Sequence, residues 1–190
     1  MNIFILDWNP KLCAQYHNDK HVVKMILETA QLLCGSHWVT GGEAPYKLSH
    51  KNHPSAIWVR EDLHNYLWLC ELGIKLCWEY NHRYGKTHKT YDILLWCSDN
   101  HPNIPNVRFT SPPLAMPDEY KLSRSISQYT VESYRAYYLG EKVKMSRWTN
   151  RSMPEWFADG INKLYEDACY MEHKPKLNRI ISMPLQYANV

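Results

Sequence analysis

Four ionisable residues near the start of the chain recur at helical spacing: His17, His21, Lys24 and Glu28. On one helix, this spacing keeps all four side chains within an arc of about 60°. The residues between them are mostly apolar, so we expect a largely buried helix whose narrow polar stripe lines an accessible space. Two imidazoles, an amine and a carboxylate can exchange protons near neutral pH. The alternative interpretation is a solvated helix face, since Lys and Glu four residues apart stabilise each other on any surface.

Lys24 is the candidate nucleophile of this stripe. On a mostly apolar helix, and close to Lys20, its amine is expected to be partly desolvated. Desolvation and a neighbouring positive charge both make a lysine amine more nucleophilic. The alternative is an ordinary lysine whose aliphatic stem lies along the surface.

A metal site is the competing chemistry for the two histidines of the stripe. His17 and His21 are four residues apart, a spacing that allows both imidazoles to bind one metal ion, and His50 and His53 could supply further nitrogen ligands. No HExxH motif and no acidic cluster accompanies them. We therefore predict neither a metal ion nor any other cofactor.

Two further stretches combine the residue types that bind nucleic acid. The first is the junction 49–54, where a helix start flanked by histidine and lysine, with Arg60 shortly after, is typical of a phosphate site. The second is the segment 134–151, in which aromatic rings that can stack on bases alternate with cations that can neutralise phosphates. A plain capped helix and a tyrosine-rich packing helix are the respective alternatives. The residues predicted to contact nucleic acid are Lys20, His50, His53, Arg60, Lys142, Lys144, Arg147 and Trp148.

Composition restricts the class of protein. The chain has 190 residues and a net charge of +3, which is compatible with a nucleic-acid partner. Eight Trp and fourteen Tyr accompany only three Phe, a composition that is typical of partly solvated clefts and of surfaces on which rings stack. The six cysteines form no CxxC pair and lie among apolar neighbours, so we expect reduced core thiols of a cytoplasmic protein. No membrane span, secretory signal, phosphate loop, dinucleotide fingerprint or GxSxG motif is present.

The pattern of apolar residues predicts an all-α fold in one compact domain, built on two long helices with long irregular loops. A helix is expected from Pro10 to about Cys34, and a second from about His53 to Tyr84, with Glu79 on its solvent side. Shorter helices are expected over 87–96, 125–139 and 154–171. Five prolines between residues 98 and 117 predict a long irregular crossing, and loops of that length are often functional.

Three segments in succession resemble a known family. These are the stretch Leu12–His17 before the striped helix, the long helix that includes Tyr66–Glu71, and the tyrosine-rich stretch Tyr134–Lys142. Together they are similar to the small all-helical pyrimidine-dimer DNA glycosylases of the phage endonuclease V type. The string Asp19–Glu28 also resembles an uncharacterised group of phage and large-virus proteins. The resemblance covers residues 1–145, the glycosylase-like core, and leaves 146–190 as a C-terminal helical extension.

The resemblance implies a glycosylase that acts on a damaged or modified pyrimidine nucleotide in double-stranded DNA and flips that nucleotide out of the stack. In the family, the α-amine of a small residue behind the initiator methionine attacks the sugar, assisted by a helix-borne glutamate. Here residue 2 is Asn, and ungapped matching places Lys24 near the family's glutamate. We therefore expect Lys24 to be the amine, with Glu28, His21 and His17 handling protons. The alternatives are another base-modifying or metal-assisted nucleotide enzyme, or a helical nucleic-acid-binding module without catalysis.

Overall fold

The structure, a computed structural model, describes the backbone of residues 1–170 and the side chains of residues 1–167, and this part of the chain is all-α and contains no strand. The predicted fold class is thereby confirmed. The α-helices of the described part are α1 (Pro10–Tyr16), α2 (Asp19–Val39), α3 (Pro54–Glu61), α4 (Leu63–Tyr84), α5 (Tyr91–Asp99), α6 (Tyr129–Tyr137) and α7 (Glu155–Tyr170).

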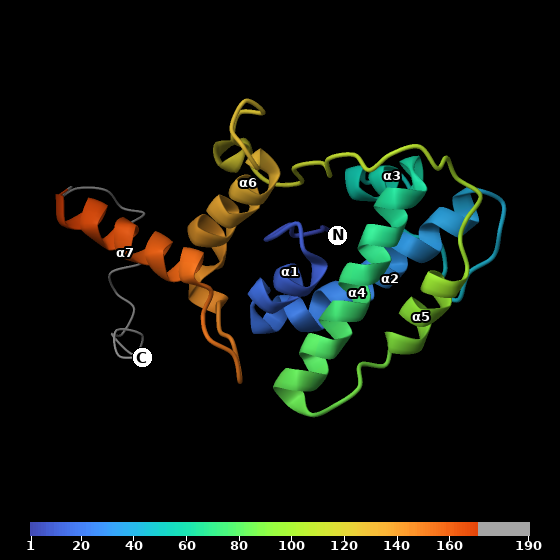
Figure 1. The fold of residues 1–190 in the computed structure, drawn as a ribbon, viewed down its shortest axis with the longest axis horizontal. Helices are drawn as coiled ribbons and strands as arrows, with labels where there is room; N and C mark the ends of the chain where they lie inside the picture. The colour runs from blue at the N-terminus through green and yellow to red at the C-terminus, as the bar shows by residue number, and fades with distance from the viewer. Residues whose placement is uncertain (171–190) are drawn as a thin grey trace.

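The two long helices α2 and α4 form the centre of the molecule, and α1, α3 and α5 pack around them (Figure 1). Their contact surfaces are apolar: Ile26 and Leu33 of α2, like Leu69 and Leu76 of α4, are completely buried. Gly73 allows α4 to approach its neighbours, since a Cβ at this position would lie 2.8 Å from side-chain atoms of Thr29 in α2 and of Leu94 in α5. Helix α7 lies beyond α6, on the side of the molecule away from α5 (Figure 1).

Both long helices are shorter than the sequence pattern predicts, because a capping residue interrupts each pattern. The side chain of Asn18 accepts the N–H of His21 and starts α2 as an N-cap, so that His17 lies outside both α1 and α2. Asp62 caps α4 in the same way by accepting the N–H of His64 at 2.9 Å, which separates α4 from α3. The predictions of unbroken helices over 10–34 and 53–84 are therefore wrong, although the helical regions themselves are correct.

The remaining helix boundaries also differ from the expected ones. Helix α2 continues through Gly35 to Val39, and α5 begins four residues later than predicted, at Tyr91. Helix α6 begins at Tyr129 and passes into a π-helical turn, Tyr138–Lys142. The predicted last helix corresponds to α7, and its expected end at Met171 lies outside the described residues.

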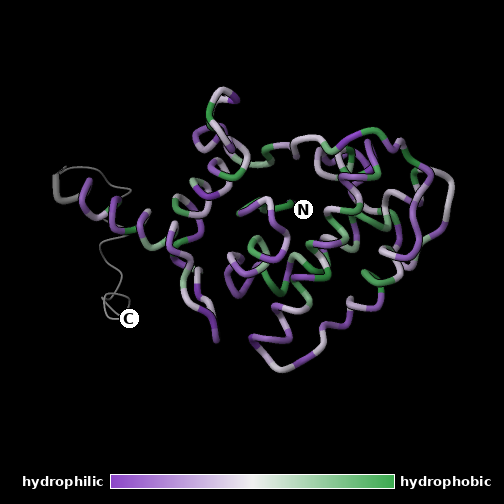
Figure 2. Tube along the Cα trace, in the orientation of Figure 1, coloured by the Kyte–Doolittle hydropathy of each residue, from purple (hydrophilic) through white to green (hydrophobic). Residues whose placement is uncertain are grey.

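The first nine residues form no helix, yet they run through the middle of the molecule (Figure 1). Ile3, Phe4, Ile5 and Leu6 are at most 5% exposed. Figure 2 shows the hydrophobic residues of this segment next to those of the central helices. The apolar run therefore holds the start of the chain inside the fold instead of leaving it on the surface.

The proline-rich crossing, residues 100–117, is held against α3 and α4 by two polar side chains. Asp62 accepts the backbone N–H groups of Val107 and Arg108 at 2.8 and 3.1 Å. Burial alone would raise the pKa of Asp62, but these bonds and those from His64 hold that pKa well below its ordinary value. Asn65 adds a reciprocal pair with Thr110, accepting from its N–H and donating to its hydroxyl. The crossing is thus an ordered wall of the molecule.

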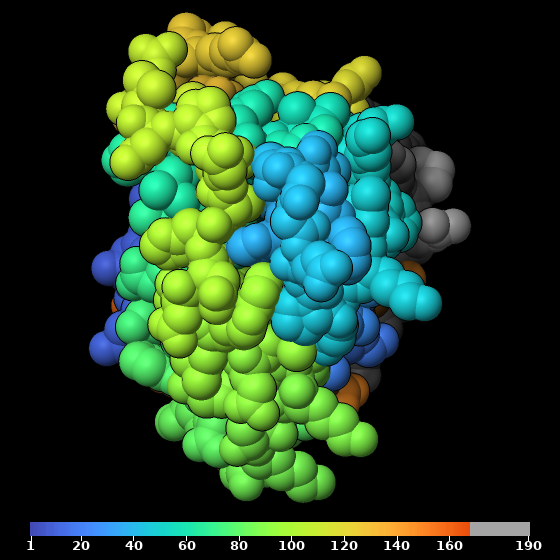
Figure 3. Space-filling view, turned by 90° about the vertical axis from the view of Figure 1, so that its right-hand side faces the viewer, coloured from blue at the N-terminus to red at the C-terminus, as the bar shows by residue number. Residues whose placement is uncertain are grey.

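The face shown in Figure 3 is closed by α5 and the loop that follows α2. Trp38 donates its indole N–H to the carbonyl of Tyr46 in this loop, and the hydroxyl of Tyr46 lies 3.1 Å from that of Thr90. Five cysteines are buried and free, as expected, and Cys169 lies outside the described side chains. In the described part of the chain, no helix has the length and apolar character needed to cross a membrane.

Candidate functional site

Glu28 is the centre of the candidate site. Its side chain is 11% exposed, and its oxygen Oε1 lies 3.1 Å from Nζ of Lys24. The other oxygen, Oε2, accepts the backbone N–H of Asn2 at 2.9 Å and lies 3.8 Å from the α-amine of Met1. A nearly buried carboxylate thus faces two amines, one from the helix and one from the start of the chain.

Asn2 holds the start of the chain in this position. Its amide group donates to the carbonyl of Ala115 at 2.9 Å, and its side-chain oxygen accepts from the hydroxyl of Tyr134 at 3.1 Å. The sequence pattern did not indicate this part of the site. The apolar run directly after Asn2 does indicate that this segment is buried. It does not indicate which way the segment runs through the fold.

Lys24 does not have the surroundings that its neighbours in the sequence indicate. Its side chain is 66% exposed, so the prediction of a partly desolvated amine is wrong. Val23 and Leu27 are each 42% exposed, and the solvent-facing side of α2 is therefore wider than the narrow stripe we expected. Lys20 is exposed on the same side, one turn earlier. Lys24 is accordingly a solvent-accessible amine that forms an ion pair with Glu28.

His21 belongs to the core. Its Nδ1 forms a hydrogen bond with the hydroxyl of Tyr138, and its ring stacks on Phe4 with the centroids 4.2 Å apart. Burial lowers the pKa of His21 to about 3, and electrostatic interactions with His17, Lys142 and Lys24 act in the same direction. The imidazole is therefore neutral at pH 7.

His17 is also buried, at the end of α1, and its Nδ1 lies 2.7 Å from the carbonyl oxygen of Cys13, to which it donates. Burial lowers the pKa of His17 to about 4, and the hydrogen bond to Cys13 only partly opposes this effect. The rings of His17 and His21 are 6.3 Å apart. Among the described residues, no group of three or more His, Cys, Asp and Glu side chains could hold a metal ion. The predicted stripe is thus two separate pairs: the buried, neutral histidines, and the charged pair of the exposed Lys24 with the nearly buried Glu28.

His53 lies at the edge of the charged pair. It is the N-cap of α3, where its Nδ1 accepts the N–H of Ser55 at 3.2 Å, so a neutral His53 carries its proton on Nε2. Burial lowers the pKa of His53, as do the charges of the N-terminal amine and of His50, while Glu28 acts in the opposite direction. These influences place His53 within electrostatic range of both groups of the candidate site.

The other two residues predicted at this junction are arranged differently. His50 is exposed and has a backbone φ of 50° in the loop before α3. Arg60 donates from Nη1 to the carbonyls of Lys51 and Ala56 at 2.8 and 2.9 Å. Its guanidinium therefore joins the loop to α3. Fewer of its N–H groups are free to bind a phosphate than the sequence suggests.

The π-helical turn after α6 places Lys142 near the site. Nζ of Lys142 lies 3.2 Å from the hydroxyl of Tyr137 and 4.5 Å from the centre of its ring. The turn requires Gly140, because a Cβ there would lie 2.3 Å from the ring of Tyr120. π-Helical turns are frequent at functional sites. The turn lies beside α2, because the hydroxyl of its first residue, Tyr138, forms a hydrogen bond with His21, and Lys142 is a further cation on this turn.

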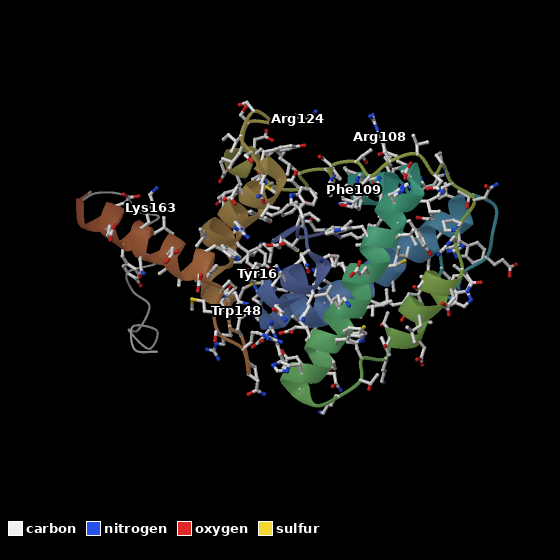
Figure 4. All side chains as sticks on the ribbon, viewed as in Figure 1. Tyr16, Arg108, Phe109, Arg124, Trp148 and Lys163 are labelled. Carbon is white, nitrogen blue, oxygen red and sulfur yellow. The ribbon has the colours of Figure 1, made fainter. Side chains whose placement is uncertain are left out.

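The connector after this turn divides into exposed and packed residues. Lys144 and Arg147 are exposed, as a phosphate-binding role requires. Trp148 is 9% exposed, donates its indole N–H to the carbonyl of Tyr16, and packs edge-on against Phe157 (Figure 4). In this arrangement Trp148 packs in the protein and does not present its ring to a base.

A buried ion-pair network, which the sequence did not reveal, holds the connector. Glu79 is 4% exposed, contrary to its predicted place on the solvent side of α4. Its carboxylate accepts from Nε of Arg83 at 2.8 Å, and from Nε and Nη2 of Arg151 at 2.9 and 2.7 Å. Arg83 also contacts Asp19 at 2.9 Å, and Asp19 in turn accepts from the backbone and hydroxyl of Thr149.

Comparison with known proteins assigns no family to the chain. No protein-family model matches it, and neither a curated protein nor a solved structure shows significant similarity to it. The functional argument therefore depends on the chemistry and geometry of the described residues.

Proposed function

We propose that the protein is a DNA-processing enzyme that acts on a damaged or modified pyrimidine nucleotide through an amine nucleophile, as glycosylases with lyase activity do. The observation that carries this proposal is the Glu28 carboxylate between two amines, Nζ of Lys24 at 3.1 Å and the α-amine of Met1 at 3.8 Å. A carboxylate in this position can accept the proton that an ammonium group must lose, and can stabilise positive charge on the sugar. The sequence resemblance to pyrimidine-dimer glycosylases favours a helical scaffold that faces DNA, more than it favours the particular mechanism.

In the proposed reaction, the neutral amine attacks C1′ of the deoxyribose. The N–C1′ bond forms while the glycosidic bond breaks, and one proton of the amine passes through Glu28 to the departing base. The sugar ring then opens, O4′ takes up the second proton of the amine, and a Schiff base remains. Removal of a C2′ proton then breaks the C3′–O bond and cuts the strand. Lys24 is the accessible amine of the two, so we assign the nucleophile to it, and Glu28 moves the protons.

The cations on this side of the molecule are proposed to hold the DNA backbone. Lys20 precedes Lys24 on the same helix, and Lys142 lies beside α2 on the π-helical turn. Lys144 and Arg147 continue the positive charge along the exposed connector. Phosphate contacts of this kind fix the register of a duplex and make binding dependent on salt.

Borohydride trapping tests the proposal directly, because borohydride reduces a Schiff base to a stable covalent adduct. The full chain is incubated with duplex DNA that carries either an abasic site or ultraviolet-induced pyrimidine dimers. We expect a trapped adduct that Lys24→Ala abolishes and Glu28→Gln strongly reduces. Lys86→Ala, which alters an exposed lysine on the turn after α4, is the control that retains full trapping.

Peptide mapping of the adduct identifies the amine. An adduct on the α2 peptide supports Lys24, whereas an adduct on residue 1 that persists in Lys24→Ala transfers the role to the α-amine at Glu28. Absence of an adduct with every DNA substrate, while duplex binding remains, would favour a nucleic-acid-binding module without catalysis.

A further inference from the structure

A groove with no assigned role lies between α3, the proline-rich crossing and the loop that precedes α6. Its volume is about 810 Å³, which is within the range of natural ligand sites. Apolar or aromatic residues from α3, the crossing and the start of α6 line it, among them Ile57, Leu114 and Tyr129. Ile57 is 38% exposed, so this floor, the apolar part of the lining, is open to solvent.

The two walls of the groove carry opposite charge. Lys121 and Arg124 lie on the loop before α6, and Glu61 lies on α3. Figure 4 shows Arg124 on this loop, beyond the crossing. Lys121 pairs with Asp118 at 2.7 Å, but the Asp118 side chain is 94% exposed, so this surface pair is weak and its lysine remains able to bind another anion.

Two residues that line the groove are direct sequence neighbours of residues at or near the Glu28 site. Pro54, at the groove, directly follows His53, which is within electrostatic range of Glu28 and the chain start. Leu114, also at the groove, directly precedes Ala115, whose carbonyl binds the side chain of Asn2. A polymeric substrate held at Glu28 can therefore continue into this groove.

We propose that the groove binds the single DNA strand that flanks the reacting nucleotide. A strand presents anionic phosphates along one edge and bases along the other, which matches one cationic wall and an apolar, aromatic floor. Its phosphates contact Arg124 and Lys121, and its bases lie over Tyr129 and Ile57. Glu61 accepts a hydrogen bond from an exocyclic amino group, so the groove prefers cytosine to thymine. This proposal rests on the proposed function, since it takes the Glu28 site as the reactive end of the same substrate.

Fluorescence anisotropy with short labelled oligo(dC) and oligo(dT) tests the groove. We expect Arg124→Glu to weaken binding of both by about tenfold or more, and to lower the slope of log K against log salt by about 1. Glu61→Ala, which removes the acceptor, is expected to weaken binding of oligo(dC) by about fivefold or more and to leave binding of oligo(dT) no weaker. Lys163→Glu makes the same charge reversal on α7, away from the groove (Figure 4), and is expected to bind both like the unaltered protein.

The results separate this proposal from the proposed function. Equal binding by Arg124→Glu and the unaltered protein overturns the groove, even if borohydride still traps an adduct. An Arg124→Glu variant that traps less adduct at low DNA concentration, and a normal amount at saturating DNA, supports it. If Arg124→Glu loses affinity while the unaltered protein gives no trapped adduct, that combination supports the strand-binding groove and contradicts the proposed Schiff-base chemistry. A loss of affinity in Lys163→Glu as large as that in Arg124→Glu also overturns the groove.

Discussion

Two carboxylates in this molecule are each nearly buried and each face two cationic groups, yet they serve different ends. Glu79 binds two guanidinium groups, those of Arg83 and Arg151, through hydrogen bonds of 2.7–2.9 Å. Glu28 faces two amines at 3.1 and 3.8 Å, one of them two-thirds exposed. A guanidinium group keeps its proton at any accessible pH, whereas an amine can lose one and become a nucleophile.

The difference shows that burial of the carboxylate does not decide whether an ion pair is structural or reactive. The type of the cation and its exposure to solvent decide it. Burial alone would raise the pKa of Glu79, but the hydrogen bonds from Arg151 and Arg83 hold that pKa below its ordinary value. Both oxygens of the Glu79 carboxylate accept hydrogen bonds from these arginines, and the bonds from Arg151 join α4 to the connector. At Glu28, the exposed Lys24 leaves one side of the carboxylate open to a substrate.

The largest effect on stability is expected from Glu79→Gln. It leaves Arg83 buried with one carboxylate fewer, and breaking a buried pair typically costs about 3–5 kcal/mol. Glu28→Gln is the matched substitution and is expected to cost only about 1 kcal/mol, because a glutamine oxygen still accepts from the Asn2 N–H. Urea denaturation measures both. An equal loss in the two variants would show that Glu28 is a structural pair as well.

Acid should destabilise the fold through the two buried histidines, His17 and His21. The pKa of His17 is lowered to about 4 and that of His21 to about 3. Below the ordinary value near 6.5 the unfolded chain therefore binds protons that the folded chain excludes, so stability rises with pH through this window and falls as the solution is acidified. From pH 7 to pH 5 we expect a loss of about 3–4 kcal/mol from the pair.

Denaturation midpoints at several pH values measure this loss, and His21→Gln should remove about half of the slope. An unchanged slope in that variant would mean that His21 is already protonated in the folded protein. In that case it belongs with the charged pair of Lys24 and Glu28.

A smaller effect is expected from Tyr138→Phe, which removes the hydroxyl that pairs with Nδ1 of His21. An unpaired buried nitrogen costs about 1–2 kcal/mol. Tyr137→Phe makes the same change at the partly exposed tyrosine beside Lys142, and we expect it to cost less than about 0.5 kcal/mol. Thermal unfolding of the two variants compares them. A larger loss from Tyr137→Phe would contradict the assignment of His21 to the core.

The smallest effect on stability is expected from Lys24→Met. An exposed lysine–glutamate pair within one helix contributes only about 0.3–0.5 kcal/mol. The same substitution should abolish borohydride trapping, if Lys24 is the nucleophile. A large loss of stability would place Lys24 in the same class as the arginines around Glu79.

The sequence alone was sufficient for the fold class, the two long helical regions and the irregular crossing, because apolar periodicity and proline act locally. Helix breaks at Asn18 and Asp62 were missed for a physical reason: Asn and Asp occur in helices as well as at caps, and tertiary contacts decide between the two. The alternative interpretation, a solvated helix face, relied on the spacing of Lys24 and Glu28, and these two residues do form an ion pair, since residues four apart on a helix are neighbours.

Only the tertiary structure decided which polar residues are buried and what they face. Glu79 and Lys75 share one helical pattern, but the connector brings Arg151 to Glu79 across 72 positions of sequence. Asn2 reaches Glu28 across 26 positions, through a buried segment whose direction no local pattern specifies. Periodicity tells which face of a helix is apolar, whereas the partners of its polar groups depend on which distant segment packs there.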